Sequence, residues 1–237
     1  MLMSHSHRFI FIHVYKVAGT SLRAALEPYA ADRWRRLWAR HLGRLYTPEL
    51  PHPHLRAAQV LDLVGPEVFN NRFKFCFVRN PWAWQVSLYH YACQAKEHYQ
   101  QQLARSFDNF DAYLKWRVNE DLHLQSEFIL DAENRLLVDH VGRIETLNDD
   151  MRVITSRIGI PGLNVPVVNR SAHKDYRSYY SDYGRKLVEE AFAPDIERFG
   201  YNFDGISGPM QLPPRAFGVE NTTPVTPGTL RQAIAQG

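Results

Sequence analysis

Residues 13–22, HVYKVAGTSL, combine the residue types that bind an anion. Gly19 allows the backbone to approach an oxyanion closely, and the helix predicted from Thr20 presents free N–H groups at the positive end of its dipole. Thr20 and Ser21 add hydroxyl groups, and Lys16 adds a positive charge. This pattern predicts a site for a phosphate-like group, although a surface lysine beside a capped helix would have the same sequence.

A second anion site is predicted within FCFVRNPWAWQVSLY, residues 75–89. Arg79 stands where a predicted strand ends, and Pro81 suits the first turn of the helix that follows. Ser87 comes six residues after Pro81, which corresponds to roughly 9 Å along a helix. A guanidinium and a hydroxyl suit a phosphate, but Arg79 in a structural salt bridge is the other interpretation.

Histidine is the side chain best suited to act as a general base near neutral pH. His52 and His54 lie in the proline-stiffened segment LPHPHL, between the two predicted anion sites in the sequence. They are candidate bases, although two solvent-exposed histidines would fit the same segment. His13 lies on the first predicted strand, and we interpret it as a packed core histidine.

The elements that must position these residues alternate between strands and helices. Buried strands are predicted at residues 8–14, 72–79 and 135–145 from their β-branched and aromatic residues. Helices are predicted from residue 20 and after Pro81, and also at 32–45, 55–64, 107–118, 122–130, 147–158 and 183–199. This alternation predicts an α/β fold with a mostly parallel sheet flanked by helices.

The chain of 237 residues is long enough for one well-packed domain. We expect this domain to span residues 1–204, followed by an extended or disordered C-terminal tail at 205–237 that is rich in Pro, Gly and Thr. The predicted helix 32–45 has a basic stripe, which is either a solvated face or a dock for an acidic acceptor or an anionic membrane surface. The stripe consists of Arg33, Arg36, Arg40 and Arg44.

Composition excludes several classes of protein. A formal net charge of +3 is too small to indicate a nucleic-acid partner. We expect a soluble, cytoplasmic protein, because no run of 18 apolar residues could span a membrane and no cleavage site follows the short apolar N-terminal segment. Cys76 and Cys93 are the only cysteines, which excludes a disulfide framework; both are predicted to be buried thiols. No spacing of residues indicates a metal site.

The first loop differs from the GxxxxGK[ST] motif of nucleoside triphosphatases. Lys16 precedes Gly19 by three residues, and Thr20 and Ser21 follow the glycine where that motif has Lys and Ser or Thr. No isolated hydrophobic strand ends in an aspartate that could hold Mg²⁺. Both differences argue against a metal-dependent kinase.

Taken together, these segments resemble sulfotransferases. HVYKVAGTSL is similar to their phosphosulfate-binding loop, and FVRNPWAWQVSLY is similar to their 3′-phosphate-binding strand and helix. The nearest branch acts on carbohydrate hydroxyls and includes the heparan 2-O- and chondroitin-type enzymes. HVGRIETLNDDM at 140–151 and the block at 169–203, which contains an FGY run, also resemble that branch. The resemblance covers roughly residues 8–203, and the two binding motifs are specific only in combination.

The resemblance implies a core related to nucleotide kinases and the donor 3′-phosphoadenosine 5′-phosphosulfate, with no metal. Lys16 would contact the oxygen that bridges phosphate and sulfate. Arg79 and Ser87 would bind the 3′-phosphate. The residues implied to cradle the 5′-phosphosulfate are Val17, Ala18, Gly19, Thr20, Ser21 and Leu22.

The base and a closing loop are also implied by the resemblance. Relatives have an H-x-H pair before the second strand whose second member is the base, which corresponds to His54 with His52 as its assistant. Other relatives use a glutamate on the first helix, for which Glu27 is the candidate. A loop that closes over the donor in relatives corresponds here to Arg170, Ser171 and Lys174.

The function that these residues favour is transfer of a sulfuryl group to a hydroxyl acceptor, most consistently a carbohydrate; an acidic glycan is one form of it that the basic stripe would suit. Two other functions remain open at this point. One is a nucleotide-dependent kinase. The other is a nucleotide-binding module without catalytic activity.

Overall fold

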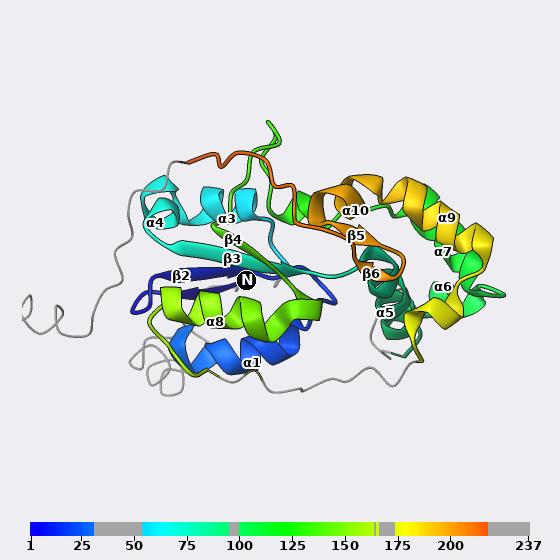
Figure 1. Ribbon diagram of the computed structural model, residues 1–237, viewed down its shortest axis with the longest axis horizontal. Coiled ribbons are helices and arrows are strands. Elements are labelled where there is room, and N and C mark those ends of the chain that lie inside the picture. Colours follow the sequence, from blue (N-terminus) through cyan, green and yellow to red (C-terminus); the bar gives the residue numbers. More distant parts are fainter. Residues whose placement is uncertain (31–53, 95–99, 164, 166–173, 218–237) are drawn as a thin grey trace, which may run out of the picture.

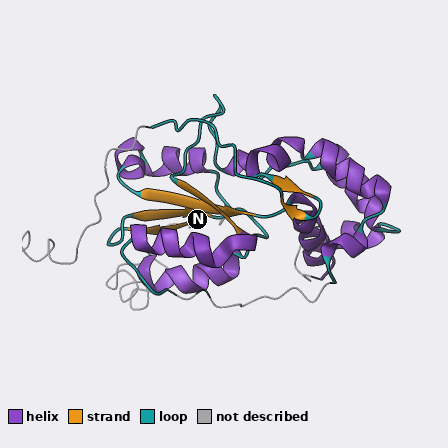
Figure 2. Cartoon of the chain, in the orientation of Figure 1, coloured by secondary structure: helices purple, strands orange, loops and turns teal. Residues whose placement is uncertain are grey.

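The structure is a computed structural model that describes residues 1–30, 54–94, 100–163, 165 and 174–217. Its main sheet has four strands in the order β1-β2-β3-β4 (Figures 1 and 2). Three neighbouring strands run parallel, and β1 runs antiparallel to β2. The strands are β1 Leu2–Ser4, β2 Phe9–Ile12, β3 Phe73–Val78 and β4 His140–Arg143. The predicted mostly parallel α/β fold is therefore confirmed.

The first residues of the chain belong to the sheet. Strand β1 pairs with β2, with Met3 opposite Ile10. The Oγ of Ser4 donates a hydrogen bond of 2.6 Å to the carbonyl of Tyr29. The N-terminus is thus fixed both to the sheet and to the end of the first helix.

Helices cover both faces of the sheet. Figure 1 shows α1 and α8 on one face and α3 and α4 on the other. These helices span Gly19–Ala30 (α1), Ala57–Val64 (α3), Pro66–Asn70 (α4) and Leu147–Arg157 (α8). Gly65 has a φ of 80°, which ends α3, and Pro66 then starts α4 because a first-turn proline needs no N–H partner.

A second group of helices lies beyond the carboxyl ends of the parallel strands, on the right in Figure 1. It contains α5 Pro81–Gln94, α6 Gln101–Ser106, α7 Phe110–Glu120, α9 Asp182–Ala191 and α10 Ala193–Phe199. Helices α9 and α10 replace the single helix predicted at 183–199. Pro194 occupies the first turn of α10 and has no N–H to continue α9.

The predicted helix at 122–130 does not form; only the 3₁₀ turn Ser126–Phe128 appears there. The backbone N–H groups of Gln125 and Ser126 donate instead to the carboxylate of Asp195, at 2.6 and 3.1 Å. A tertiary contact has therefore replaced the helical hydrogen bonds. The predicted helix 32–45, with its basic stripe, lies outside the described residues.

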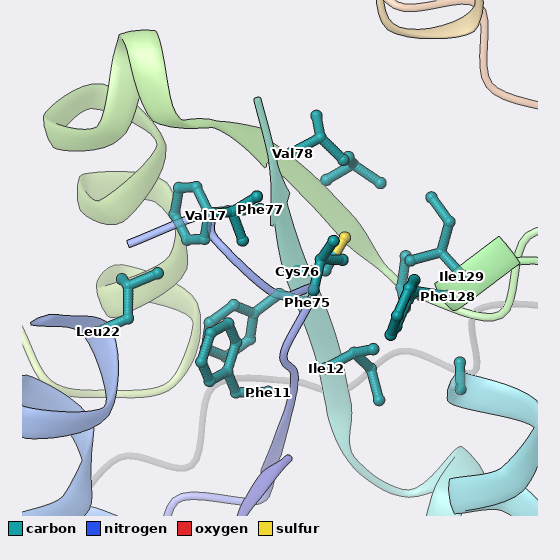
Figure 3. Packing of buried hydrophobic residues seen from close by; sticks show 14 of the residues in the cluster. Phe11, Ile12, Val17, Leu22, Phe75, Cys76, Phe77, Val78, Phe128 and Ile129 are labelled. Atoms are coloured by element: carbon teal, nitrogen blue, oxygen red, sulfur yellow. The ribbon is translucent and has the colours of Figure 1, made fainter. Parts of the chain in front are cut away.

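The centre of the sheet is an apolar core of alternating side chains. Figure 3 shows Phe11, Phe75 and Phe77 together on one side of the strands, and Ile12 and Cys76 on the other. The rings of Phe11 and Phe75 are stacked at 5.3 Å. Burial of one such aromatic ring stabilises the fold by about 2–3 kcal/mol. Both faces of the sheet are covered by apolar side chains. We therefore expect polar functional groups at the ends of β2 and β3.

The two cysteines differ in burial. Cys76 lies on β3 and is fully buried, as predicted, whereas Cys93 on α5 is only partly buried. Both are free thiols. None of the described helices combines the length and apolar character needed to cross a membrane.

The chain after residue 204 continues along the folded unit as far as it is described. The hairpin of β5 Tyr201–Asn202 and β6 Gly205–Ile206 is followed by an extended segment. Leu136 donates its N–H to Pro214 at 2.9 Å, and its carbonyl accepts from Ala216 at 2.9 Å. Residues 205–217 are therefore hydrogen-bonded to the domain.

Candidate active site at two strand-to-helix corners

Two loops leave the sheet side by side at the carboxyl ends of β2 and β3. We call residues 13–19 the first corner and residues 79–81 the second corner. Because β2 and β3 are parallel neighbours with Ile12 opposite Cys76, both corners lie at the same edge. The indole Nε1 of Trp84, on the helix after the second corner, donates a hydrogen bond of 2.8 Å to the carbonyl of Tyr15 in the first.

The backbone of the first corner is unusual. Lys16 has a φ of 62° and Ala18 a φ of 55°, the left-handed region that residues with a side chain rarely adopt. Such conformations cost about 1–3 kcal/mol each and concentrate at functional sites. The N–H of Leu22 donates to the carbonyl of Ala18 at 3.0 Å, and this bond joins the strained loop to α1.

Gly19 makes room for the imidazole of His13. A Cβ placed on Gly19 would lie 1.5 Å from the Nε2 of His13, so no larger residue fits without displacing that ring. His13 is buried in the core, as predicted. Side-chain packing is therefore one reason for the glycine at this position, and the close approach of an anion stays a prediction.

Lys16 and Arg79 bring two positive charges together. Burial, and to a lesser degree the charge of Arg79, lowers the pKa of Lys16 to about 8. Burial also lowers the pKa of Arg79, against the opposing effect of the Glu145 carboxylate. The Nζ of Lys16 lies 4.0 Å from the centre of the Tyr91 ring.

Among the described residues, the side chains of Lys16 and Arg79 form no ion pair, so the salt bridge considered for Arg79 is not formed there. Glu145 instead accepts hydrogen bonds from the N–H of Asn80 and the hydroxyl of Tyr201. Two partly desolvated cations side by side are costly unless an anion binds between them.

The second corner is held by Gln125, which sequence reasoning missed. The Oε1 of Gln125 accepts from the N–H of Arg79 at 2.9 Å, and its Nε2 donates to the carbonyl of Arg79 at 2.8 Å. The fully buried carboxylate of Asp195 binds the backbone of Gln125, and burial raises the pKa of this carboxyl to about 6. Gln125 and Asp195 are both distant from Arg79 in the sequence, so no local sequence pattern predicted these contacts.

The stretch that contains Glu145 also supports the second corner. The Oδ1 of Asn80 accepts from the N–H groups of Trp82 and Ala83, at 3.1 and 3.3 Å, and so caps the start of α5. Glu145 accepts from the N–H of Asn80 at 2.9 Å and from the Tyr201 hydroxyl at 2.7 Å. Glu145, in the segment 140–151, and Tyr201, in the FGY run, thus fix the backbone beside Arg79.

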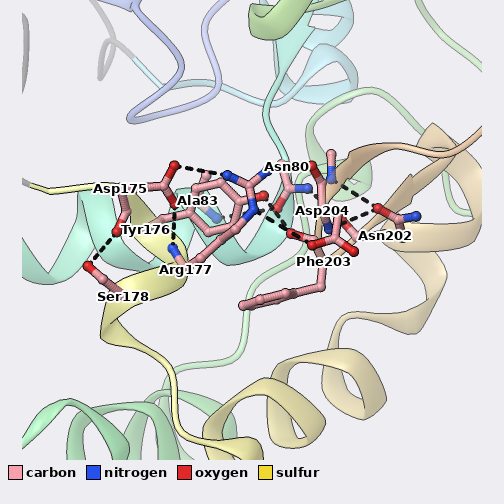
Figure 4. Close-up of polar contacts among 10 residues, drawn as sticks. Asn80, Ala83, Asp175, Tyr176, Arg177, Ser178, Asn202, Phe203 and Asp204 are labelled. Atoms are coloured by element: carbon pink, nitrogen blue, oxygen red, sulfur yellow. Dashed lines mark hydrogen bonds and ion pairs between the residues drawn. The ribbon is translucent and has the colours of Figure 1, made fainter.

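Residues 175–178 are fastened to the same region, as Figure 4 shows. The hydroxyl of Tyr176 donates to the carbonyl of Phe203 at 2.5 Å, and the Nδ2 of Asn80 donates to the carbonyl of Asn202 at 2.8 Å. Of the predicted closing-loop residues, Lys174 is exposed just before this anchor. Arg170 and Ser171 lie outside the described residues.

His54 contacts the first corner through its ring. Its Nδ1 lies 3.1 Å from the carbonyl of His13, and the two imidazole centres are 4.4 Å apart. A carbonyl only accepts hydrogen bonds, so Nδ1 carries the proton, and Nε2 of the neutral ring keeps its lone pair. A lone pair held in this way can accept a proton from a substrate hydroxyl. His52, its predicted assistant, lies outside the described residues.

The remaining predicted site residues have different environments. Val17 and Leu22 are buried in the core, so they can offer a ligand only backbone groups. Ser87 is also buried, on α5. Glu27 is exposed on α1, eight residues after Gly19 and thus roughly 12 Å along the helix from its first turn.

The first turn of α1 presents Thr20 to solvent and buries Ser21. The first N–H groups of a helix have no partner within it, so this turn can donate hydrogen bonds to an anion. Within the described part of the chain, no group of three His, Cys, Asp or Glu side chains is arranged to hold a metal ion.

His13 gives the stability of the protein a predicted pH dependence. Burial, and then the charge of His54, lowers the pKa of His13 to about 3, whereas an unfolded histidine titrates near 6.5. As the pH falls from 6.5, the unfolded chain takes up a proton that the native protein does not. We expect this to remove on the order of 4 kcal/mol of stability by pH 3. Urea unfolding of wild type and His13→Gln from pH 4 to 7.5 tests this.

The comparison of the two proteins isolates His13 from other titrating groups. The difference in unfolding free energy between wild type and His13→Gln should be largest at pH 7.5 and shrink steadily toward pH 4. A difference that stays constant across this range would mean that the native imidazole titrates normally.

A parallel sheet whose strand-to-helix corners present cations and helix N-termini at its carboxyl edge is the arrangement of α/β proteins that bind phosphate-like anions. Residues 1–202 match the sulfotransferase family. Because this match spans most of the 237 residues, the chain belongs to the sulfotransferase family.

An uncharacterized protein from Archaeoglobus fulgidus is 28% identical over 132 residues, which cover 51% of this chain and 96% of that protein. No solved structure matches this chain significantly.

Proposed function

We propose that this protein transfers the sulfuryl group of 3′-phosphoadenosine 5′-phosphosulfate to a hydroxyl of a carbohydrate. The observation that carries this proposal is the convergence of Lys16 and Arg79 from two neighbouring corners, with no carboxylate paired to either among the described residues. A donor with anionic groups at both ends supplies the missing negative charge at each corner.

The two corners have different roles in this proposal. Lys16 and the first turn of α1 bind the 5′-phosphosulfate, because a point charge and free N–H groups suit the end where the reaction occurs. Arg79, with Ser87 on the helix that follows, binds the 3′-phosphate through its planar guanidinium. Recognition of that phosphate distinguishes the donor from ordinary nucleotides.

The reaction uses groups at the first corner. The Nε2 of His54 accepts the proton of the acceptor hydroxyl while the acceptor oxygen forms a bond to sulfur. The bond between sulfur and the bridging oxygen breaks, and its electron pair stays on the phosphate. Lys16 stabilises that developing charge by preorganised electrostatics, which is worth about 3 kcal/mol for a well-placed donor.

The carbohydrate acceptor follows from the sequence resemblance, since the nearest branch of the family acts on sugar hydroxyls. The hydrogen bond from His54 to the His13 carbonyl supports this part of the proposal, because it orients a base of the kind that branch uses. An acidic carbohydrate would also suit the arginine-rich stretch predicted at 32–45.

Calorimetry with two nucleotides tests the donor. Adenosine 3′,5′-bisphosphate should bind wild type at least tenfold more tightly than 5′-AMP, because only the former reaches Arg79. Arg79→Gln should weaken binding of the bisphosphate about 10- to 100-fold, the effect of losing a charge-assisted contact, and leave 5′-AMP binding within twofold. Equal losses for both nucleotides would contradict the role of Arg79. Preference for ADP with a Mg²⁺ requirement would favour a kinase instead.

Transfer to carbohydrates is tested separately with sulfur-labelled donor and a panel of neutral and acidic glycans. His54→Gln should retain donor binding and lose nearly all transfer, since the amide cannot act as a base. A wild-type protein that binds the donor but labels no glycan in the panel would contradict the proposed acceptor and favour a binding module.

A further inference from the structure

A cavity of about 210 Å³ opens at the amino ends of β3 and β4. The two corners lie at the carboxyl ends of the same parallel sheet, so this cavity is at the opposite edge and separate from the proposed active site. Its lining combines apolar and cationic side chains. The apolar ones include Phe73, Leu136, Val153 and Phe217, and the cationic ones are Arg72, Lys74, Arg157 and Arg215.

Positive charge exceeds negative charge in this lining. Asp139 is the only carboxylate among the lining residues described. Lys74 binds one of its oxygens at 2.9 Å, and Arg215 lies 3.4 Å from the other. The carboxylate of Asp139 is therefore shared by two cations, Lys74 and Arg215. Arg72 and Arg157 add two further positive charges without another carboxylate in the lining.

Two of these arginines retain unused donors. Within the described part of the chain, the guanidinium of Arg157 has no hydrogen bond or ion pair, although it stands exposed on α8. Arg72 donates from Nη1 to the carbonyl of Val68, and its Nη2 lies 2.9 Å from Nδ1 of His5, but its Nε is buried without a partner among described residues. A buried donor without an acceptor is rare in folded proteins, so the lining is short of acceptor atoms.

We infer that this cavity is a second anion site, which takes a small molecule carrying a phosphate or sulfate ester on a compact ring. Guanidinium groups match the oxygens of such esters through paired hydrogen bonds. The rings of Phe73 and Phe217, which line the same cavity, supply apolar surface for the carbon part of the ligand. A site for a bare ion would need neither this volume nor these aromatic walls.

Calorimetry on the full chain with 4-nitrophenyl phosphate and 4-nitrophenyl sulfate tests the site. We expect one-to-one binding of at least one ester that weakens with added salt. Arg157→Gln should weaken it about tenfold, the usual effect of losing one charge-assisted hydrogen bond, and Arg157→Glu should weaken it further. Arg157 is exposed and has no hydrogen bond or ion pair with a described residue, so we expect neither variant to change the thermal unfolding temperature.

Two controls locate the binding. Arg152 lies on the same helix, is exposed and is paired with Asp149, so Arg152→Gln should leave the affinity unchanged. Arg79→Gln, at the opposite edge of the sheet, should also have no effect. The inference is overturned if neither ester binds at millimolar concentration, if Arg157→Glu binds as wild type does, or if Arg79→Gln abolishes binding. The tighter of the two esters shows whether the site prefers a phosphate or a sulfate ester.

Discussion

Replacing Lys16 by methionine is expected to lower kcat for sulfuryl transfer by about two to three orders of magnitude, the usual effect of removing a preorganised donor at a developing negative charge. Affinity for adenosine 3′,5′-bisphosphate should fall by less than tenfold. In the proposed mechanism, the ammonium interacts most strongly with the bridging oxygen as the bond to sulfur breaks, so its contribution would be made mainly in the transition state.

The measurement is a kinetic comparison with a matched surface variant. Lys186 is an exposed lysine on α9 that lies 3.8 Å from the carboxylate of Glu190, and Lys186→Met should transfer at the wild-type rate. If Lys16→Met raised KM and left kcat unchanged, the role of Lys16 would be ground-state binding only.

In the wild type, kcat/KM should also decrease above pH 8, because the pKa of Lys16 is lowered to about 8.

Gly19→Ala is expected to destabilise the protein by about 3 kcal/mol or more, at the upper end of the usual cost of overpacking a core. The added methyl group would lie 1.5 Å from the Nε2 of His13, so the imidazole must leave its position. The ring of His54, centred 4.4 Å from that of His13, would be displaced with it. Urea unfolding at pH 7.5 measures the loss.

A second substitution makes this prediction specific. Shortening the clashing side chain in the double variant His13→Ala/Gly19→Ala should recover most of the steric cost, so the two effects should be strongly non-additive. Gly208→Ala is the control, because a Cβ there would meet no described atom within 4 Å. Simple additivity of the two changes would show that the alanine is tolerated in some other way.

The sequence predicted the parts of the site whose determinants are local. Strand β2, its loop and α1 follow one another directly, and a hydrophobic run followed by Gly19 and Thr20 is enough to place a strand-to-helix turn. Residues 72–79 and Pro81 predicted the second corner in the same way. The parallel pairing that brings the corners together followed from the α/β alternation.

Interactions between residues distant in the sequence were not predicted. Gln125 pairs with the backbone of Arg79, 46 positions away, and the carboxylate of Asp195 accepts from the N–H groups of Gln125 and Ser126. Local helix or strand propensity does not predict such contacts, because burial and tertiary hydrogen bonds can override that propensity. Strand β1 was also not predicted, because a strand of three residues has too little hydrophobic periodicity to be recognised in the sequence.

The hydrogen bond from the Trp84 indole to the Tyr15 carbonyl joins the helix that follows Arg79 to the loop that contains Lys16. It therefore restrains how far the two cations can move apart. In the proposed function, this restraint would select ligands by the spacing of their charged groups. A nucleotide whose spacing differs from that of the proposed donor would then engage one cation only.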